Sequence, residues 1–66
     1  MTIRLNGEPY ELPGTCTILQ LLERLEIHPR RVAVEHNLTI IKRQRYETTE
    51  INEGDQVEIV NFVGGG

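Results

Sequence analysis

Apolar and polar residues alternate near the start of the chain, in the way typical of half-buried β-strands. Residues 2–6 alternate in this way and run into Asn6-Gly7, a pair that tolerates positive φ and favours a tight hairpin turn. The chain then returns over residues 8–12, where Pro9 lacks a backbone N–H and suits an edge position. The pattern predicts a β-hairpin whose second strand lies at the edge of a sheet.

The next segment has the period of an amphipathic helix. Its apolar residues recur three or four positions apart and form a single stripe, made of Ile18, Leu21, Leu22 and Leu25. Thr17 followed by Gln20 matches a capping box, in which each side chain bonds an N–H group of the first turn. Pro29 cannot continue the helix. A helix over residues 18–26 is expected.

The second half of the chain is rich in strand signals. Short strands are predicted at residues 32–36 and 40–41. A polar connection with a few apolar anchors is predicted at residues 46–51. After a tight turn at residues 53–55, residues 56–63 form the most strand-prone stretch of the chain. The predicted order is β-β-α-β-β-β. Residues 1–66 are therefore expected to form one α+β domain, with a mixed sheet packed on one helix.

The last predicted strand has apolar residues on both faces. Val57 and Ile59 share one parity, whereas Val60 and Phe62 share the other. A sheet covered by a helix on one side needs apolar residues on only one parity. Either Val60 and Phe62 lie on the open face, where they form a patch for docking a partner, or a β-bulge returns them to the core. The sequence leaves both interpretations open.

Composition and charge restrict the class of protein. The chain has 66 residues, one cysteine and a net charge of −3, and no apolar run is long enough to span a membrane. These features predict a soluble cytoplasmic protein without disulfides, and they argue against a binder of nucleic acid or membranes. The basic residues cluster at positions 42–45, with Arg30-Arg31 upstream. That cluster is read either as a solvated turn or as a patch that steers an acidic partner.

The side chains do not assemble a recognisable catalytic set. No phosphate-binding loop, Cys/His pair at useful spacing or group of metal ligands is present in the sequence. His28 and His36 are expected to be surface residues. Cys16 precedes the helix cap, where a thiolate would be favoured, although a half-buried small side chain is the favoured interpretation. We expect no catalytic residue, no metal and no enzyme.

The remaining candidate is the glycine tail, which comprises Gly64, Gly65 and Gly66. Three residues without Cβ atoms could thread a narrow channel and reach at most about 10 Å. A carboxylate at Gly66 is a poor electrophile, so a partner would have to activate it, for example as an acyl-adenylate. A sulfur nucleophile could then displace AMP and leave a thiocarboxylate. The alternative is a frayed terminus or a cloning scar.

The hairpin, the capped helix beginning at residues 17–22 and the ending over residues 53–66 resemble the ThiS sulfur carriers of thiamine biosynthesis. The resemblance implies a ubiquitin-like β-grasp fold. It also implies three partners: a ThiF-like adenylating enzyme, a sulfur-donor enzyme and a ThiG-like thiazole synthase. Gly66 would bear the sulfur, with Gly64 and Gly65 as the tail that enters partner active sites. No cofactor would be bound, since AMP and the thiocarboxylate are transient covalent groups formed with the partner's ATP.

Three other functions are compatible with the residues. A molybdopterin-type carrier of the MoaD kind also ends in Gly-Gly and uses the same activation. A ubiquitin-like modifier would join Gly66 to a lysine amine. A plain β-grasp interaction module would leave the tail unused.

Overall fold

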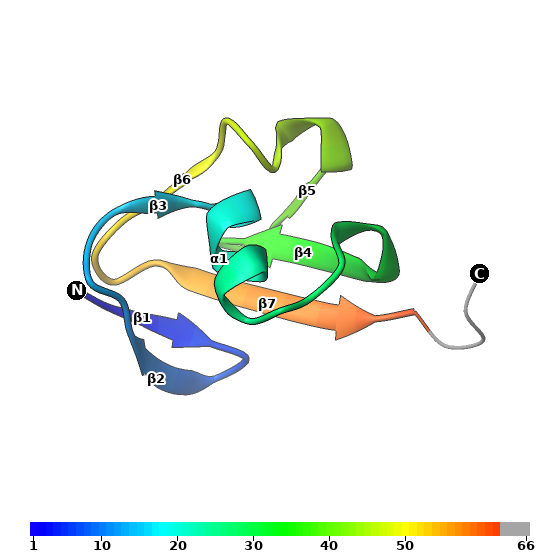
Figure 1. Cartoon of the computed structure of the whole chain (residues 1–66). Coiled ribbons are helices and arrows are strands. Elements are labelled where there is room, and N and C mark those ends of the chain that lie inside the picture. The colour runs from blue at the N-terminus through cyan, green and yellow to red at the C-terminus, as the bar shows by residue number, and fades with distance from the viewer. Residues whose placement is uncertain (63–66) are drawn as a thin grey trace.

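A five-stranded mixed sheet carries one α-helix across one of its faces (Figure 1). The structure is a computed structural model and describes residues 1–62. The strand order is β2-β1-β7-β4-β5, with β1 and β7 parallel and every other neighbouring pair antiparallel. The strands are β1 (Thr2–Leu5), β2 (Glu8–Glu11), β4 (Val32–His36), β5 (Thr39–Ile41) and β7 (Gln56–Asn61). The predicted α+β architecture, with its sheet packed on one helix, is confirmed.

The first hairpin forms as its sequence predicts. Asn6 and Gly7 have φ values of 51° and 84°, which are the left-handed values required by a two-residue hairpin loop. Strand β2 lies at the edge of the sheet, so the edge position predicted from Pro9 is correct. Each of the two strands ends one residue earlier than predicted. Residue 6 belongs to the turn, and residue 12 lies beyond β2 with its side chain in the core.

The capping box predicted at the start of the helix is present. Helix α1 spans Ile18–Arg24, and the N–H of Gln20 donates to Thr17 Oγ1 at 3.1 Å. The N–H of Thr17 donates in return to Gln20 Oε1 at 2.8 Å. These reciprocal bonds satisfy two of the N–H groups that the first turn cannot pair with its own carbonyls.

The helix ends at Arg24, so the predicted end at residue 26 is wrong. Glu26 has a φ of 59° and its N–H donates to the carbonyl of Glu23 at 3.0 Å, while the N–H of Ile27 donates to the carbonyl of Leu22 at 2.9 Å. These two bonds form a Schellman motif, which usually places glycine at the left-handed position. The sequence has glutamate there, and the usual signal for a helix end is therefore missing.

The predicted element order also lacks two strands and two short helices. They are β3 (Cys16–Thr17), η1 (Pro29–Arg31), η2 (Arg43–Arg45) and β6 (Glu50–Ile51), with β3 and β6 forming a separate two-stranded antiparallel sheet. The segment expected to be a polar connection with a few apolar anchors has buried anchors at Tyr46 and Ile51, and it also bonds the start of the helix. The N–H groups of Ile18 and Leu19 donate to the carbonyls of Thr49 and Tyr46 at 3.0 and 2.9 Å.

The core lies between α1 and the sheet. The helix contributes three fully buried side chains of the predicted stripe, and strands and loops supply the others. The ten buried residues of the core are Ile3, Leu12, Ile18, Leu21, Leu22, Val32, Val34, Tyr46, Ile51 and Val57. Because α1 packs on one face of the sheet, no described element covers the opposite face (Figure 1).

Candidate functional site

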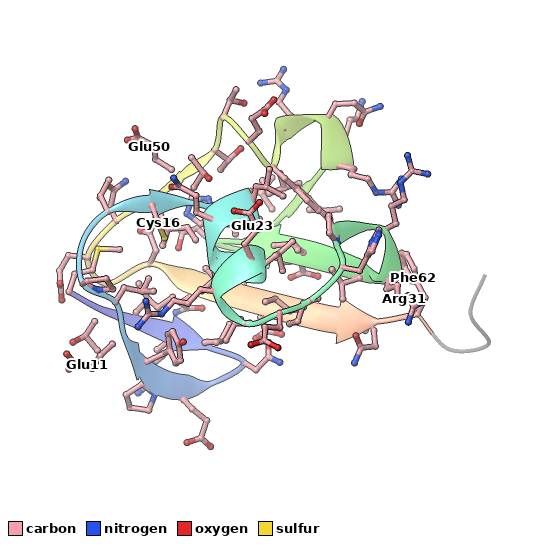
Figure 2. All side chains as sticks on the ribbon, in the orientation of Figure 1. Glu11, Cys16, Glu23, Arg31, Glu50 and Phe62 are labelled. Atoms are coloured by element: carbon pink, nitrogen blue, oxygen red, sulfur yellow. The ribbon has the colours of Figure 1, made fainter. Side chains whose placement is uncertain are left out.

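Strand β7 leads the chain toward the predicted glycine tail. It lies in the middle of the sheet, between β1 and β4. Beyond Asn61, the N–H of Phe62 still donates to the carbonyl of Arg31 at 3.0 Å, and the two side chains lie next to each other in Figure 2. The chain is therefore held by backbone hydrogen bonds as far as Phe62, one residue beyond β7. Strand β7 ends at Asn61 and Phe62 lies outside it, so the predicted strand end at residue 63 is wrong. Gly64, Gly65 and Gly66 lie outside the described residues.

Two hydrogen bonds from one side chain hold the middle of β7 on the side that faces β1. The parallel pairing with β1 ends at Leu5 and Val57. Two residues further along β7, the N–H of Ile59 donates to Asn6 Oδ1 at 2.7 Å, and Asn6 Nδ2 donates to the carbonyl of Ile59 at 3.1 Å. Asn6 thus has two roles, because its backbone makes the hairpin turn and its amide continues the sheet.

The two apolar parities of β7 face opposite sides of the sheet. Val57 is fully buried and Ile59 packs partly buried against the core, whereas Val60 and Phe62 are 59% and 49% exposed. The register with β4 runs without interruption from Val57 to Asn61, so no bulge turns Val60 inward. The interpretation that places Val60 and Phe62 on the open face is correct. Whether a partner docks there stays a prediction.

The start of β7 is fixed by Asp55, a residue that the sequence reasoning placed only in a turn. Its Oδ2 accepts the N–H of Asn52 at 2.8 Å and lies 2.7 Å from Nε2 of His36, at the end of β4. Burial alone would raise the pKa of Asp55, but hydrogen bonds from Asn52, His36 and Asn37 outweigh it and lower the pKa below its usual range. The turn before β7 is therefore tied to the end of β4.

The hydrogen bond of Asp55 within its own turn could be expected from the sequence. Gly54 has a φ of 82°, and an aspartate beside such a glycine often bonds backbone N–H groups of its own turn. The contact with His36 was not visible, since it spans 19 residues and depends on the register of β4 with β7. His36 was expected to be a surface residue, yet its side chain is only 16% exposed.

The other candidate side chains do not gather into a site. His28 caps η1 by accepting the N–H of Arg30 on Nδ1 at 3.1 Å. Cys16 is half-buried, and burial raises the pKa of its thiol against the opposing effect of Arg24. The helix cap therefore does not favour a thiolate, and the half-buried interpretation is correct. Within residues 1–62, no group of three or more His, Cys, Asp or Glu side chains could hold a metal ion. No helix in the same residues is long and apolar enough to cross a membrane.

Charge is divided between two parts of the molecule. Residues 30–45 hold five of the seven basic side chains and one of the ten acidic ones, a net charge of +4, whereas the remaining two basic and nine acidic side chains carry −7. Figure 2 places Arg31 beside Phe62 at one end of the molecule, with Glu11 and Glu50 toward the other. Among the described residues, His36 and Asp55 make the only contact within 4 Å between a basic and an acidic side chain, so the Lys and Arg side chains of residues 30–45 have no carboxylate partner within that distance.

The fold and the site together define a small β-grasp protein, in which a helix packs on a mixed sheet and the central strand leads to a glycine-rich end. The ThiS family model matches residues 3–66, and the chain belongs to the ThiS family.

The relatives support this assignment. The chain is similar to the sulfur carrier protein ThiS of Bacillus subtilis, with 40% identity over 97% of this chain and 98% of that protein. It is also similar to a thiazole synthase of Magnetococcus marinus, with 42% identity over all of this chain but only 20% of that protein. The chain thus spans about a fifth of that synthase. A crystal structure of the thiamine biosynthesis protein ThiS from Geobacter metallireducens matches with a TM-score of 0.88 and 32% identity over the full length of both chains. The expected ubiquitin-like β-grasp fold is confirmed.

Proposed function

We propose that this chain is a sulfur carrier of thiamine biosynthesis and that the carboxylate of Gly66 is the group that carries the sulfur. The observation that supports this most directly is the extent of the family match, which runs through Gly64, Gly65 and Gly66. A second support is β7, because a central strand held on both sides gives the tail a rigid base.

The proposed chemistry has two steps, both supplied by partners. In the first, an oxygen of the Gly66 carboxylate attacks the α-phosphorus of ATP on a ThiF-like adenylating enzyme, which forms the acyl-adenylate and releases pyrophosphate. In the second, hydrosulfide (sulfur already at the sulfide level) supplied by a donor enzyme attacks the acyl carbon. A C–S bond forms as the C–O bond to AMP breaks, AMP leaves, and loss of the S–H proton gives the thiocarboxylate. The chain itself acts as a co-substrate without a catalytic residue or a bound cofactor.

We propose a thiazole synthase as the acceptor of that sulfur. The support is the similarity of the whole chain to about a fifth of the Magnetococcus marinus thiazole synthase. Joining two proteins in one chain raises the effective concentration of each near the other, and such fusion is favoured for proteins that act together.

Intact mass spectrometry tests the carrier chemistry. We expect the protein, incubated with the adenylating enzyme, ATP and a sulfur donor, to gain the mass difference between one sulfur and one oxygen atom. Deletion of Gly66 should abolish that gain and leave the thermal midpoint unchanged, since a terminal glycine adds little to stability. An unchanged mass of the full chain, with an adenylating enzyme shown to be active on another carrier, would contradict the proposal. Formation of an amide with a lysine of another protein would instead identify a ubiquitin-like modifier.

A further inference from the structure

The backbone of β5 leaves hydrogen-bonding groups free at one edge of the sheet. The N–H of Asn37 donates to the carbonyl of Gln56 at 2.8 Å, and that of Phe62 to the carbonyl of Arg31 at 3.0 Å. Odd-numbered residues from 31 to 37 therefore direct their backbone groups toward β7. Because these groups alternate along a strand, the even-numbered residues of β4 direct theirs toward β5.

The register of β5 then determines which of its residues are free. His36 pairs with Thr39 and Val34 with Ile41, so Thr39 and Ile41 are the residues bonded to β4. Ile40, between them, directs its N–H and C=O away from β4, in the plane of the sheet and beyond its free edge. Lys42 continues in extended conformation, with φ −68° and ψ 145°, and its N–H points to the same side. The free edge of β5 thus offers a short ladder for a further strand.

The other edge of the sheet is closed to such pairing. On β2 the same alternation, set by the bond from Leu12 N–H to the carbonyl of Met1 at 2.8 Å, makes Pro9 an outward-facing residue. Pro9 has no N–H to offer, and the charged Glu8 and Glu11 flank the strand at either end. Proline and charge are common means of protecting an edge. The three residues of β5 include neither, and the first charged residue on this edge is Lys42, directly after the strand.

Two exposed apolar side chains lie on this unprotected edge. Ile40 is 72% exposed, and Leu38, in the turn before β5, is 82% exposed. Leu38 also has a φ of 71° in a two-residue hairpin loop, where Gly7 occupies the equivalent position of the first hairpin. A β-substituted residue is strained in that conformation, and strained residues concentrate at functional surfaces. Folding alone therefore does not explain a leucine at this position.

The charge beside the edge selects the kind of partner. Lys42, Arg43 and Arg45 follow β5 directly and are exposed, within the basic part of the molecule. A second copy of this chain would bring two such basic segments together, which disfavours self-pairing through β5. An acidic partner segment, by contrast, is attracted by the same basic side chains.

We propose that the free edge of β5 binds an extended segment of a partner protein, which adds a strand to the sheet. The segment exchanges backbone hydrogen bonds with Ile40 and Lys42, covers Leu38 and Ile40 with branched apolar side chains, and places acidic side chains beside Lys42, Arg43 and Arg45. This surface is distinct from Val60 and Phe62, since Ile40 aligns with Glu35 and Glu58 across the sheet and Val60 aligns with Ala33. The proposal does not depend on the carrier chemistry.

Peptide titration followed by amide NMR tests this pairing. The probe is a blocked peptide, Glu-Glu-Glu-Val-Thr-Val-Thr, and the matched control is Lys-Lys-Lys-Val-Thr-Val-Thr. We expect the acidic peptide to shift the amide signals of Ile40 and Lys42 with a Kd on the order of 1 mM, as a short unrestrained segment would give. The basic peptide should shift neither. Raising the salt to about 0.5 M should weaken the acidic peptide severalfold.

Two variants separate backbone pairing from loose attraction of charge. Ile40→Pro removes the outward N–H of residue 40 without removing a bond to β4, and we expect the resulting loss of pairing to abolish the shift of the Lys42 amide. Ile40→Val retains that N–H and should bind as the parent does. The proposal is overturned if no shift occurs at about 5 mM acidic peptide, if both peptides bind equally, or if folded Ile40→Pro binds as well as Ile40→Val. Broadening of the Ile40 signal that grows with protein concentration, without peptide, would assign the edge to a second copy and would also overturn the proposal.

Discussion

At the scale of single residues, the two hairpin loops place different side chains in the same conformation. Gly7 and Leu38 are the second residues of the two-residue loops that begin at Asn6 and Asn37, with φ values of 84° and 71°. Glycine adopts this conformation without strain, whereas for a residue with a Cβ it costs about 1–2 kcal/mol. The two positions therefore form an internal comparison.

We expect Leu38→Gly to raise the free energy of unfolding by about 1 kcal/mol, because it removes the strain and exposes no buried surface. Gly7→Ala should lower it by a similar amount. A Cβ added at Gly7 meets no atom within 4 Å, so the loss would arise from backbone conformation alone. Urea unfolding of both variants checks this. A destabilised Leu38→Gly variant would show that the leucine side chain supports the fold.

The ionisation of Asp55 favours the folded state. Its pKa in the folded chain lies below the ordinary value of about 3.9, so its negative charge favours folding at neutral pH. That contribution is present above about pH 4 and is lost as the pH falls through the lower pKa of the folded state. Asp55→Asn should therefore be less stable than the parent by about 1–2 kcal/mol at pH 7.

The difference between parent and Asp55→Asn should shrink as the pH falls below about 4, as measured by urea unfolding at several pH values. Glu50→Gln, at an exposed position on β6, serves as a control and should have little effect at any pH. A difference that stays constant between pH 7 and the acid range would mean that Asp55 acts through its shape and not through its charge.

At the scale of elements, the parts predicted from the sequence are those with a repeating pattern. Alternation and the Asn6-Gly7 turn identify the first hairpin, and the stripe with its capping box identifies α1. Strands β3 and β6 were missed because two residues are too few to show alternation. The end of α1 was missed because Glu26 occupies a position where glycine is the usual signal.

The candidate site was predicted unevenly for the same kind of reason. Parity along one strand separated Val60 and Phe62 from Val57 and Ile59, but the sequence left open whether a bulge returned them to the core, and the structure shows them exposed. The contacts of Asp55 with His36 and of Asn6 with Ile59 join distant residues and exist only once the strands are in register.

Strand β7 carries two apolar side chains that the core does not use, and their replacement tests the proposed docking face. Phe62→Asp should weaken binding to the adenylating enzyme by about tenfold or more, since interface aromatics often contribute over 1 kcal/mol. The thermal midpoint should change little, because Phe62 is half exposed. Gln56→Asp is the matched control, because Gln56 is exposed on the same strand with the same parity as Val60 but lies at the other end of β7. Equal loss of binding in both variants, by calorimetry, would contradict a docking face centred on Phe62.

At the scale of the whole molecule, an acidic chain presents a basic region at residues 30–45. Arg31 belongs to this region and bonds the chain at Phe62, where β7 leads on to the tail. A field of this shape orients a protein before contact, because an acidic partner surface attracts one end and repels the other. Under the proposed function, the basic region is therefore suited to orient the end of β7 toward the proposed adenylating enzyme.

This orientation should appear in the rate of association. We expect Lys42→Glu combined with Arg43→Glu to lower the association rate constant with the adenylating enzyme by about tenfold at low salt, and to change the dissociation rate constant less. The difference should disappear by about 0.5 M salt, where screening shortens the range of the field to a few ångströms. Arg4→Glu combined with Arg24→Glu makes the same change in net charge outside residues 30–45. Stopped-flow measurements should therefore show a smaller effect for that control, and equal effects of the two pairs would mean that net charge, and not its segregation, governs the encounter.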